Sequence, residues 1–399
     1  MFQGHILDAF PWLAADEHIL VADVYDPMHL EALEQFKERN PLERERISHL
    51  SAEVLNAQLE RADFLLCASE KQRDFWLGHL AALGRVNPAT YDDDPSLRSL
   101  LAVVPFGIQE ERPVRSRSAI KGTVPGIATT DKVILWGGGI YNWFDPITLV
   151  RAVAKIAEHR DDVRLYFLGV RHPNPHVPEM QVAVQTQALA AELGLTDRVV
   201  FFNTGWVEYE DRANYLLDAD IGVSTHYEHL ETSFSFRTRI LDYLWAGLPI
   251  VSTDGDTFAD LIHAHGLGRV VPPEDVDALV IALEEILDDE AGRSSITESI
   301  DEFSEQYRWS RTLAPLVEFC AKPQPAPDRR RRVALVRDRR EQELHDHILN
   351  LRREVGEVQD AFAAVLVRKS WRLTAPLRSA YGFMRRTRRR MSRHPLDPA

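Results

Sequence analysis

Short apolar runs alternate with longer amphipathic segments through the middle of the chain. The apolar runs predict strands at 132–137, 163–169, 198–203, 220–224, 249–253 and 268–271. The segments between them predict six helices. The first begins at Asp145-Pro146, the second runs through Leu189 and the third lies near Asn214. The fourth spans 236–246, the fifth lies near Asp260 and the sixth spans 274–288. Short buried strands separated by helices are typical of a parallel sheet covered on both faces. We therefore expect a doubly wound α/β domain over 120–320.

The first 115 residues have the same alternation, but with fewer strands. Strands are predicted at 18–23, 63–69 and 101–107, and helices at 28–38, 43–60 and 70–83. A sheet of a doubly wound domain usually has about five or six strands. We expect residues 1–115 to form a partial N-terminal domain of the same class, which is either small or without its opening strands.

Beyond Cys320 the pattern changes. Residues 321–332 are rich in Pro and Arg and predict a linker. Residues 333–367 carry apolar side chains at alternating spacings of four and three, which indicates a coiled-coil helix and a possible homodimer. One amphipathic helix packed on its own chain is the alternative. Residues 368–399 mix aromatic and arginine residues, which suits an anionic membrane surface, whereas a solvated tail would look similar.

Charge is distributed unevenly along the chain. The net charge is −14, but from Ala321 onward there are 20 Lys and Arg against 9 Asp and Glu, leaving 27 against 52 in the rest. The acidic body argues against nucleic acid as a partner. Two cysteines form no disulfide framework, and no signal peptide or membrane-spanning run is evident. We expect a cytoplasmic protein, and the basic tail suggests a peripheral location on the inner membrane face.

A glycine run follows the first strand of the larger domain. Gly137, Gly138 and Gly139 would allow backbone N–H groups to approach a phosphate, although the full G-x-G-x-x-G pattern is absent because position 142 is Asn. A plain tight turn is the alternative.

A second group of polar residues lies between the strand at 220–224 and the helix at 236–246. Loops after the carboxyl ends of parallel strands are where open α/β sheets bind ligands. Arg237 and Arg239 begin the helix, where the helix dipole is unfavourable for cations unless an anion binds there. These arginines predict a diphosphate site, because guanidinium and phosphate pair bidentately. Glu231 and Asp242 could accept hydrogen bonds from sugar or ribose hydroxyls, and ion pairs between the arginines and nearby acids are the alternative.

The ordered set of segments resembles a known family. The sequence GLPIV follows a predicted helix that carries Asp242 five residues before the Gly. Together with VILWGGG, LYFLG, VVFFNTGWV, DADIGVS and RWSRTLAPLVEF, it is similar to family-4 retaining glycosyltransferases with two Rossmann-like domains, the GT-B fold. The N-terminal segments VYDPMHLE and VVPFGI, and the tail motif SWRLTAPLR, resemble bacterial surface-polysaccharide transferases.

The resemblance has departures. In the family, seven residues separate the two glutamates. Here Asp242 holds the second position and Phe234 the first, so Glu231 would take the first role from a longer loop. The family's Arg and Lys after the glycine turn are replaced by Gly139 and Phe144, so Arg237 or Arg239 would supply the charge.

By resemblance, the donor is a nucleoside diphosphate sugar, the acceptor is a glycan or a lipid-linked glycan, and the sugar configuration is retained. Glu231, Asp242 and His29 are the candidate catalytic residues. Asp26 would contact acceptor or donor sugar and Trp206 the base, although Asp26 could be a local cap and Trp206 a core residue. We expect no cofactor and no metal site. The alternative is an inactive module that binds a sugar nucleotide or a partner protein, and a sugar-nucleotide epimerase is less favoured.

Overall fold

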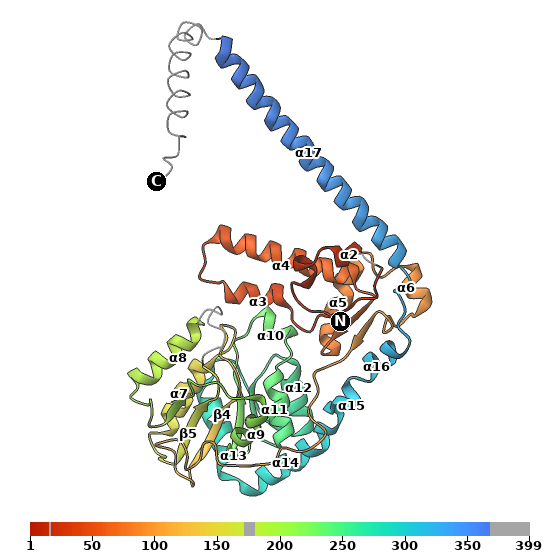
Figure 1. The fold of residues 1–399 in the computed structure, drawn as a ribbon. Helices are drawn as coiled ribbons and strands as arrows, with labels where there is room; N and C mark the ends of the chain where they lie inside the picture. Colours follow the sequence, from red (N-terminus) through yellow and green to blue (C-terminus); the bar gives the residue numbers. More distant parts are fainter. Residues whose placement is uncertain (16, 171–179, 368–399) are drawn as a thin grey trace, which may run out of the picture. The chain divides into compact units, whose positions relative to one another are not determined.

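The computed structural model describes residues 1–15, 17–170 and 180–367, which fall into one compact unit through Arg332 and a second one beyond it. The first unit contains two parallel sheets (Figure 1). The smaller sheet has the order β1-β2-β3, from Val21–Asp23, Phe64–Cys67 and Leu101–Val103. Its flanking helices are α1 (Ile6–Ala9), α2 (Trp12–Ala15), α3 (Met28–Gln35), α4 (Pro41–Arg61), α5 (Glu70–Ala82) and α6 (Pro88–Asp93).

The larger sheet is parallel, with the order β6-β5-β4-β7-β8-β9. Its strands are β4 (Lys132–Trp136), β5 (Val163–Phe167), β6 (Val200–Phe202), β7 (Ile221–Ser224), β8 (Ile250–Thr253) and β9 (Gly268–Val271). This order corresponds to the 3-2-1-4-5-6 arrangement of dinucleotide-binding folds, in which the crossover direction reverses between the two central strands. Ligands bind at that reversal, which here lies between the carboxyl ends of β4 and β7.

Helices cover both faces of the larger sheet and enclose the main hydrophobic core, as Figure 1 shows. They are α7 (Pro146–Ile156), α8 (Gln181–Glu192), η1 (Tyr209–Asp211), α9 (Arg212–Leu216), α10 (Leu230–Phe234), α11 (Thr238–Ala246), α12 (Thr257–His265), α13 (Val276–Asp288), α14 (Glu290–Ser304) and η2 (Glu305–Tyr307). The α/β fold class and the predicted strands are confirmed. The segment around Glu231, expected to be only loop, contains α10, and α6 was not predicted.

Local sequence explains where the helices of the site begin and end. The Asp145 side chain accepts a hydrogen bond from the Thr148 amide at 2.9 Å, and Pro146 occupies the first turn of α7, as predicted. α11 ends at Gly247 with φ +65°, a left-handed cap that a glycine adopts without steric cost. The following Leu-Pro then enters β8.

After α15 (Trp309–Thr312), helix α16 (Ala314–Ala321) returns to the smaller sheet. Leu313, Leu316 and Phe319 pack on that sheet, and the Phe319 ring stacks on Phe64 at 4.4 Å. The segment expected to be a linker is also anchored, because Asp328 is buried in an ion pair with Arg85 at 2.9 Å. A segment remote in sequence therefore completes the smaller sheet's core.

The last described helix is α17 (Arg329–Val367). It contains the predicted heptad segment, and the apolar side chains of that segment are exposed from Leu344 to Phe362. The basic tail at 368–399 lies outside the described residues. No described helix is long and apolar enough to cross a membrane.

Candidate functional site

The loop after β4 presents open backbone N–H groups at the reversal point of the larger sheet. Gly138 has φ +106°, and a Cβ at this position would meet nothing within 4 Å. In the part of the chain that the structure describes, the amides of Gly138 and Gly139 donate no hydrogen bond. The Gly137 amide instead donates to the Tyr243 hydroxyl at 2.8 Å. This arrangement can accept an anion, because adjacent unpaired N–H groups form a concavity of positive partial charge.

Tyr243 joins the two strands that flank this loop. Its hydroxyl lies 3.1 Å from the Leu135 carbonyl of β4 and 2.9 Å from the Val223 carbonyl of β7. Gly222 of β7 is necessary beneath the ring, since a Cβ there would lie 2.5 Å from Tyr243. The fully buried ring thus fixes the glycine loop against α11.

Arg239 points from the first turn of α11 to the same loop. Its Nη2 donates to the Gly139 carbonyl at 2.8 Å, and the guanidinium lies over the rings of Trp136 at 4.3 Å and Phe144 at 4.0 Å. Nη1 is buried without a hydrogen-bond partner, and no acidic side chain of the described residues pairs with Arg239. Burial lowers the pKa of this guanidinium to about 10, so it stays charged at neutral pH.

Arg237 differs from Arg239 in having a counter-ion. Both terminal nitrogens donate to the two oxygens of Glu231 at 2.8 Å, and Nε lies 3.9 Å from Asp256. Both partners of the main pair are almost fully buried. The predicted alternative of an ion pair between an arginine and a nearby acid therefore holds for Arg237. Arg239 carries the charge that remains uncompensated beside the glycine loop.

The smaller sheet's helices position the segment that carries Glu231. The Gln72 side-chain amide donates to the Phe234 carbonyl at 2.8 Å and to the Tyr25 carbonyl at 2.7 Å. The Phe234 ring packs on Phe75 with centroids 4.4 Å apart. α10 is therefore held between the two sheets.

Two carboxyl groups of the smaller domain lie near Glu231. Asp26 follows β1, and Glu31 lies in the first turn of α3. Burial is the main cause that raises the pKa of Glu31 to about 9, and the negative charges of Asp26 and Glu231 add to it. Burial also raises the pKa of Asp26, and the Glu31 carboxyl is protonated at neutral pH. Sequence reasoning identified Asp26 but missed Glu31, because an acid in a first helical turn resembles an ordinary dipole partner.

His29 lies in an aromatic group between α3 and α5. Its ring stacks on Phe75 with centroids 5.8 Å apart and is 6.4 Å from the ring of His79. Burial, reinforced by His79, lowers the pKa of His29 to about 4, so the ring is neutral at pH 7. Nδ1 is buried and has no partner among the described residues.

Asp242 and Trp206 lie toward α9. The Asp242 carboxylate accepts a hydrogen bond from Arg212 at 3.0 Å and remains 40% exposed. The Arg212 guanidinium lies over the Tyr209 ring at 3.5 Å and the Trp245 ring at 4.5 Å. Trp206 is 62% exposed, so it is a surface ring and not the core residue that was the alternative.

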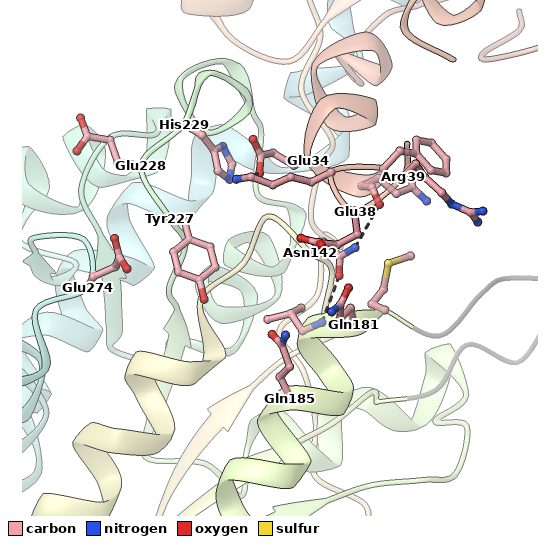
Figure 2. A pocket seen from close by; sticks show the side chains of 15 residues that line it. Glu34, Glu38, Arg39, Asn142, Gln181, Gln185, Tyr227, Glu228, His229 and Glu274 are labelled. Carbon is pink, nitrogen blue, oxygen red and sulfur yellow. Dashed lines mark hydrogen bonds and ion pairs between the residues drawn. The ribbon is translucent and has the colours of Figure 1, made fainter. Parts of the chain in front are cut away.

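A cavity of about 610 Å³ opens between α3, α8 and the loop after β7, with Asn142 on its wall (Figure 2). Polar side chains dominate its wall: Glu34, Glu38, Arg39, Asn142, Gln181, Gln185, Tyr227, Glu228, His229 and Glu274. Asn142 bridges the two sides, because its side chain donates to the Gln35 carbonyl at 3.4 Å and accepts from the Val182 amide at 3.3 Å. This wall matches a ligand with many hydroxyl groups. Sequence reasoning missed it, since its members come from distant segments.

Metal ligation has no support in the residues that the structure describes, where no cluster of three or more His, Cys, Asp or Glu side chains could hold an ion. His226 is fully buried 3.5 Å from Asp256, and His229 lies on the cavity wall.

Comparison with known proteins relates the larger sheet to one family. Residues 131–289 match the family model described as glycosyl transferases group 1. A D-inositol 3-phosphate glycosyltransferase of Corynebacterium aurimucosum is 29% identical over 49% of this chain and 44% of its own length. A phosphatidyl-myo-inositol mannosyltransferase of Mycolicibacterium smegmatis is 27% identical over 42% of this chain and 39% of its own length. The chain thus spans about two fifths of the length of these curated relatives.

Solved structures show the same architecture over both sheets. Sucrose-phosphate synthase from Thermosynechococcus elongatus superposes with a TM-score of 0.58 at 17% identity, over 80% of this chain and 72% of that one. Anabaena HepE in complex with UDP-glucose superposes with a TM-score of 0.54 at 15% identity, over 76% of this chain and 72% of that one. The chain therefore has the GT-B fold, and its segment 131–289 is similar to the family of group 1 glycosyl transferases.

Proposed function

We propose that this chain transfers a sugar from a nucleoside diphosphate sugar to a hydroxyl of a glycan or lipid-linked glycan. One observation carries the proposal: Arg239 is a buried cation beside open backbone amides, and no acidic partner among the described residues compensates it. Burying an unpaired charge costs several kcal/mol. A bound diphosphate would offset that cost through charge-assisted hydrogen bonds.

The diphosphate would lie between the glycine loop and α11. Gly138 and Gly139 would donate their free amides, and Arg239 would donate through Nη1. The N-terminus of α11 has no side-chain cap, so its first amides and dipole add positive potential. These groups would stabilise the negative charge that develops on the departing diphosphate, which is how preorganised donors accelerate such a reaction.

The nucleoside would extend toward α9. Asp242 is exposed enough to accept hydrogen bonds from ribose hydroxyls while it remains bonded to Arg212. Trp206 offers an exposed ring on which a base could stack. The HepE structure contains UDP-glucose, which supports a uridine nucleotide as the first donor to examine.

The sugar and the acceptor would lie on the side of the smaller sheet. The 610 Å³ cavity between α3 and α8 is large enough for a glycan segment, while Glu231 is buried in α10 and Asp26 lies after β1. His29 is neutral and would act there as a hydrogen-bonding or packing residue. We propose retention of the anomeric configuration, as the resemblance to family-4 retaining glycosyltransferases implies, with Glu231 held in place by Arg237.

Association with a membrane and with a second copy completes the proposal. The basic tail at 368–399 would contact anionic lipid on the cytoplasmic side, where a lipid-linked acceptor is anchored. The heptads of α17 would pair with another copy. Ile348 and Val355 fall at the position where β-branched residues favour two-stranded coiled coils, and Leu344 and Leu351 fall at the partner position.

The competing proposal is an inactive module that binds a sugar nucleotide. The same Glu231–Arg237 pair favours it, because the pair neutralises a candidate catalytic carboxylate. The deciding experiment incubates the full chain with a panel of UDP-, GDP- and dTDP-sugars and measures released nucleoside diphosphate. Release with at least one donor supports a transferase. Donor binding by calorimetry without release supports the module, and absence of both binding and release overturns the proposed donor site.

A further inference from the structure

A second cavity, of about 370 Å³, lies at the carboxyl end of β1. It is formed by residues 3–5, α3 and α4, apart from the loop after β4 and from α11 that would hold the diphosphate. Asp23, Asp26 and Glu31 contribute carboxyl groups to its wall, and Gln58 and Ser51 contribute an amide and a hydroxyl. The volume is within the range of cavities that bind small molecules.

Carboxyl groups outnumber basic groups in this cavity: His5 is the one basic side chain among its described lining residues, and the charge of Arg237 reaches Glu31 from outside it. Lys and Arg are absent from the described residues that line it, and none of the three carboxyl groups forms an ion pair within the described ranges. Asp23 accepts one hydrogen bond, from the Tyr25 amide at 3.2 Å. Burial raises the pKa of Asp23 to about 6, and the charge of Asp26 adds to this effect. At neutral pH the Asp23 carboxyl is therefore mostly ionised, whereas the Glu31 carboxyl is protonated.

Buried polar groups on the same wall also have no partner. Gln58 is only 2% exposed, and its side-chain amide forms no hydrogen bond within the part of the chain that the structure describes. Asp26 Oδ1 is likewise buried without a partner. An unmade hydrogen bond on a buried atom such as Asp26 Oδ1 is costly, so a ligand that donates to it would stabilise the fold around it.

We propose that this cavity binds a small amino sugar through its free ammonium group. An ammonium group has three N–H donors and one positive charge, which match the carboxyl groups of Asp23, Asp26 and Glu31. The Gln58 amide and the Ser51 hydroxyl would bind ring hydroxyls. A phosphorylated sugar is excluded from this site, because its charge has the same sign as the wall.

The test measures binding and not transfer, so its result is independent of the proposed activity. Calorimetry or ligand-observed NMR on the full chain would compare glucosamine with N-acetylglucosamine, which has the same ring without the charge. We expect glucosamine to bind at least tenfold more tightly, since a charge-assisted hydrogen bond is worth about a factor of ten. Equal affinities, or preference for the acetylated sugar, would overturn the proposal.

Variants locate the site. Asp23→Asn should weaken glucosamine binding at least tenfold, and Gln58→Leu, which keeps a buried side chain of similar size, should weaken it severalfold. Glu38→Gln removes a carboxylate from the other cavity and should leave binding unchanged. A loss with Glu38→Gln but not with Asp23→Asn would place the ligand elsewhere and defeat the proposal.

Proton release provides a readout that does not depend on the folding of a variant. An ammonium group next to the Asp26–Glu31 pair favours its fully ionised form, so binding by the unaltered chain should expel protons. Calorimetry at pH 7 in buffers of different ionisation enthalpy measures this number directly. Binding without proton release would contradict contact with the pair.

Discussion

The guanidinium of Arg239 donates to the carbonyl of Gly139 at 2.8 Å and leaves Nη1 buried and unbonded. Trp136 Nε1 donates to the same carbonyl at 3.2 Å, which fixes the peptide orientation in the glycine loop. The contact therefore holds a loop with open amides next to a cation that has no acidic partner among the described residues. This is the relationship on which the proposed donor site depends.

Replacement of Arg239 should weaken nucleotide binding without damaging the ligand-free fold. Arg239→Gln is expected to reduce the affinity for UDP, or for whichever nucleoside diphosphate binds, at least tenfold, because a charge-assisted hydrogen bond contributes about 1.5–3 kcal/mol. The melting temperature without ligand should change little, since a buried unpaired charge is also removed. Calorimetry and thermal unfolding measure the two effects. Arg269→Gln, which alters an exposed pair with Glu285, is the control.

The conformation of the glycine loop can be tested with a matched pair of alanine variants. Gly138→Ala places a side chain at φ +106°, where a strain of about 1–3 kcal/mol is expected, and this should displace the loop amides and lower nucleotide affinity about tenfold. Gly194→Ala places the same strain at φ +64° in a remote turn that is also sterically open. Both variants should melt earlier, but only the first should bind poorly. Equal affinities would exclude the loop from the site.

The Arg237–Glu231 pair should behave as a buried ion pair in stability measurements. Arg237→Met or Glu231→Leu alone is expected to cost about 3–5 kcal/mol, because each leaves its partner charged and buried. The double variant should recover most of that loss. Urea unfolding of the four proteins gives the coupling free energy. Additive single effects would mean that the two side chains do not stabilise each other.

Stability should fall as the pH rises through the range in which Glu31 ionises. Its folded pKa is raised to about 9 from 4.5, so the folded state holds a proton that the unfolded state releases above about pH 4.5. The free energy of unfolding therefore decreases with rising pH between these values. Glu31→Gln should flatten the decrease and stabilise the protein at pH 8 by at least about 1 kcal/mol. Denaturant unfolding of both proteins at pH 5, 6.5 and 8 measures the free energy of unfolding at each pH. If Glu31→Gln leaves its dependence on pH unchanged, the effect does not come from Glu31.

Removal of residues 368–399 should separate membrane association from donor chemistry. The shortened chain retains α17 and all elements of the donor site, so release of nucleoside diphosphate should persist. Its flotation with vesicles that contain phosphatidylserine should drop sharply, because each basic residue near an anionic surface contributes about 1 kcal/mol. Neutral phosphatidylcholine vesicles are the control. Undiminished flotation of the shortened chain would remove the tail from the proposed membrane contact.

The candidate site was only partly predictable from the sequence. The glycine run and the two arginines stood out, because both are unusual at their expected positions in a strand–helix pattern. The sequence did not predict that the two arginines have different partners. The distances from Arg237 to Glu231 and from Arg239 to Gly139 depend on the orientation of α10 and α11. No local sequence pattern marks Glu31 or Gln58 as a binding residue. Their significance comes from a cavity formed by segments that are far apart in sequence.

Local patterns along the chain were sufficient to predict the helices, the strands and the α/β class. Alternating or continuous apolar runs and helix caps are properties of short segments. They predict a parallel α/β arrangement without knowledge of the contacts. The order of the strands and the return of α16 to the smaller sheet depend on tertiary packing. The same holds for the counter-ion of Arg237, which Arg239 lacks among the described residues. These features depend on long-range packing and on burial, which set the free energy of each charge and are not encoded in any short segment.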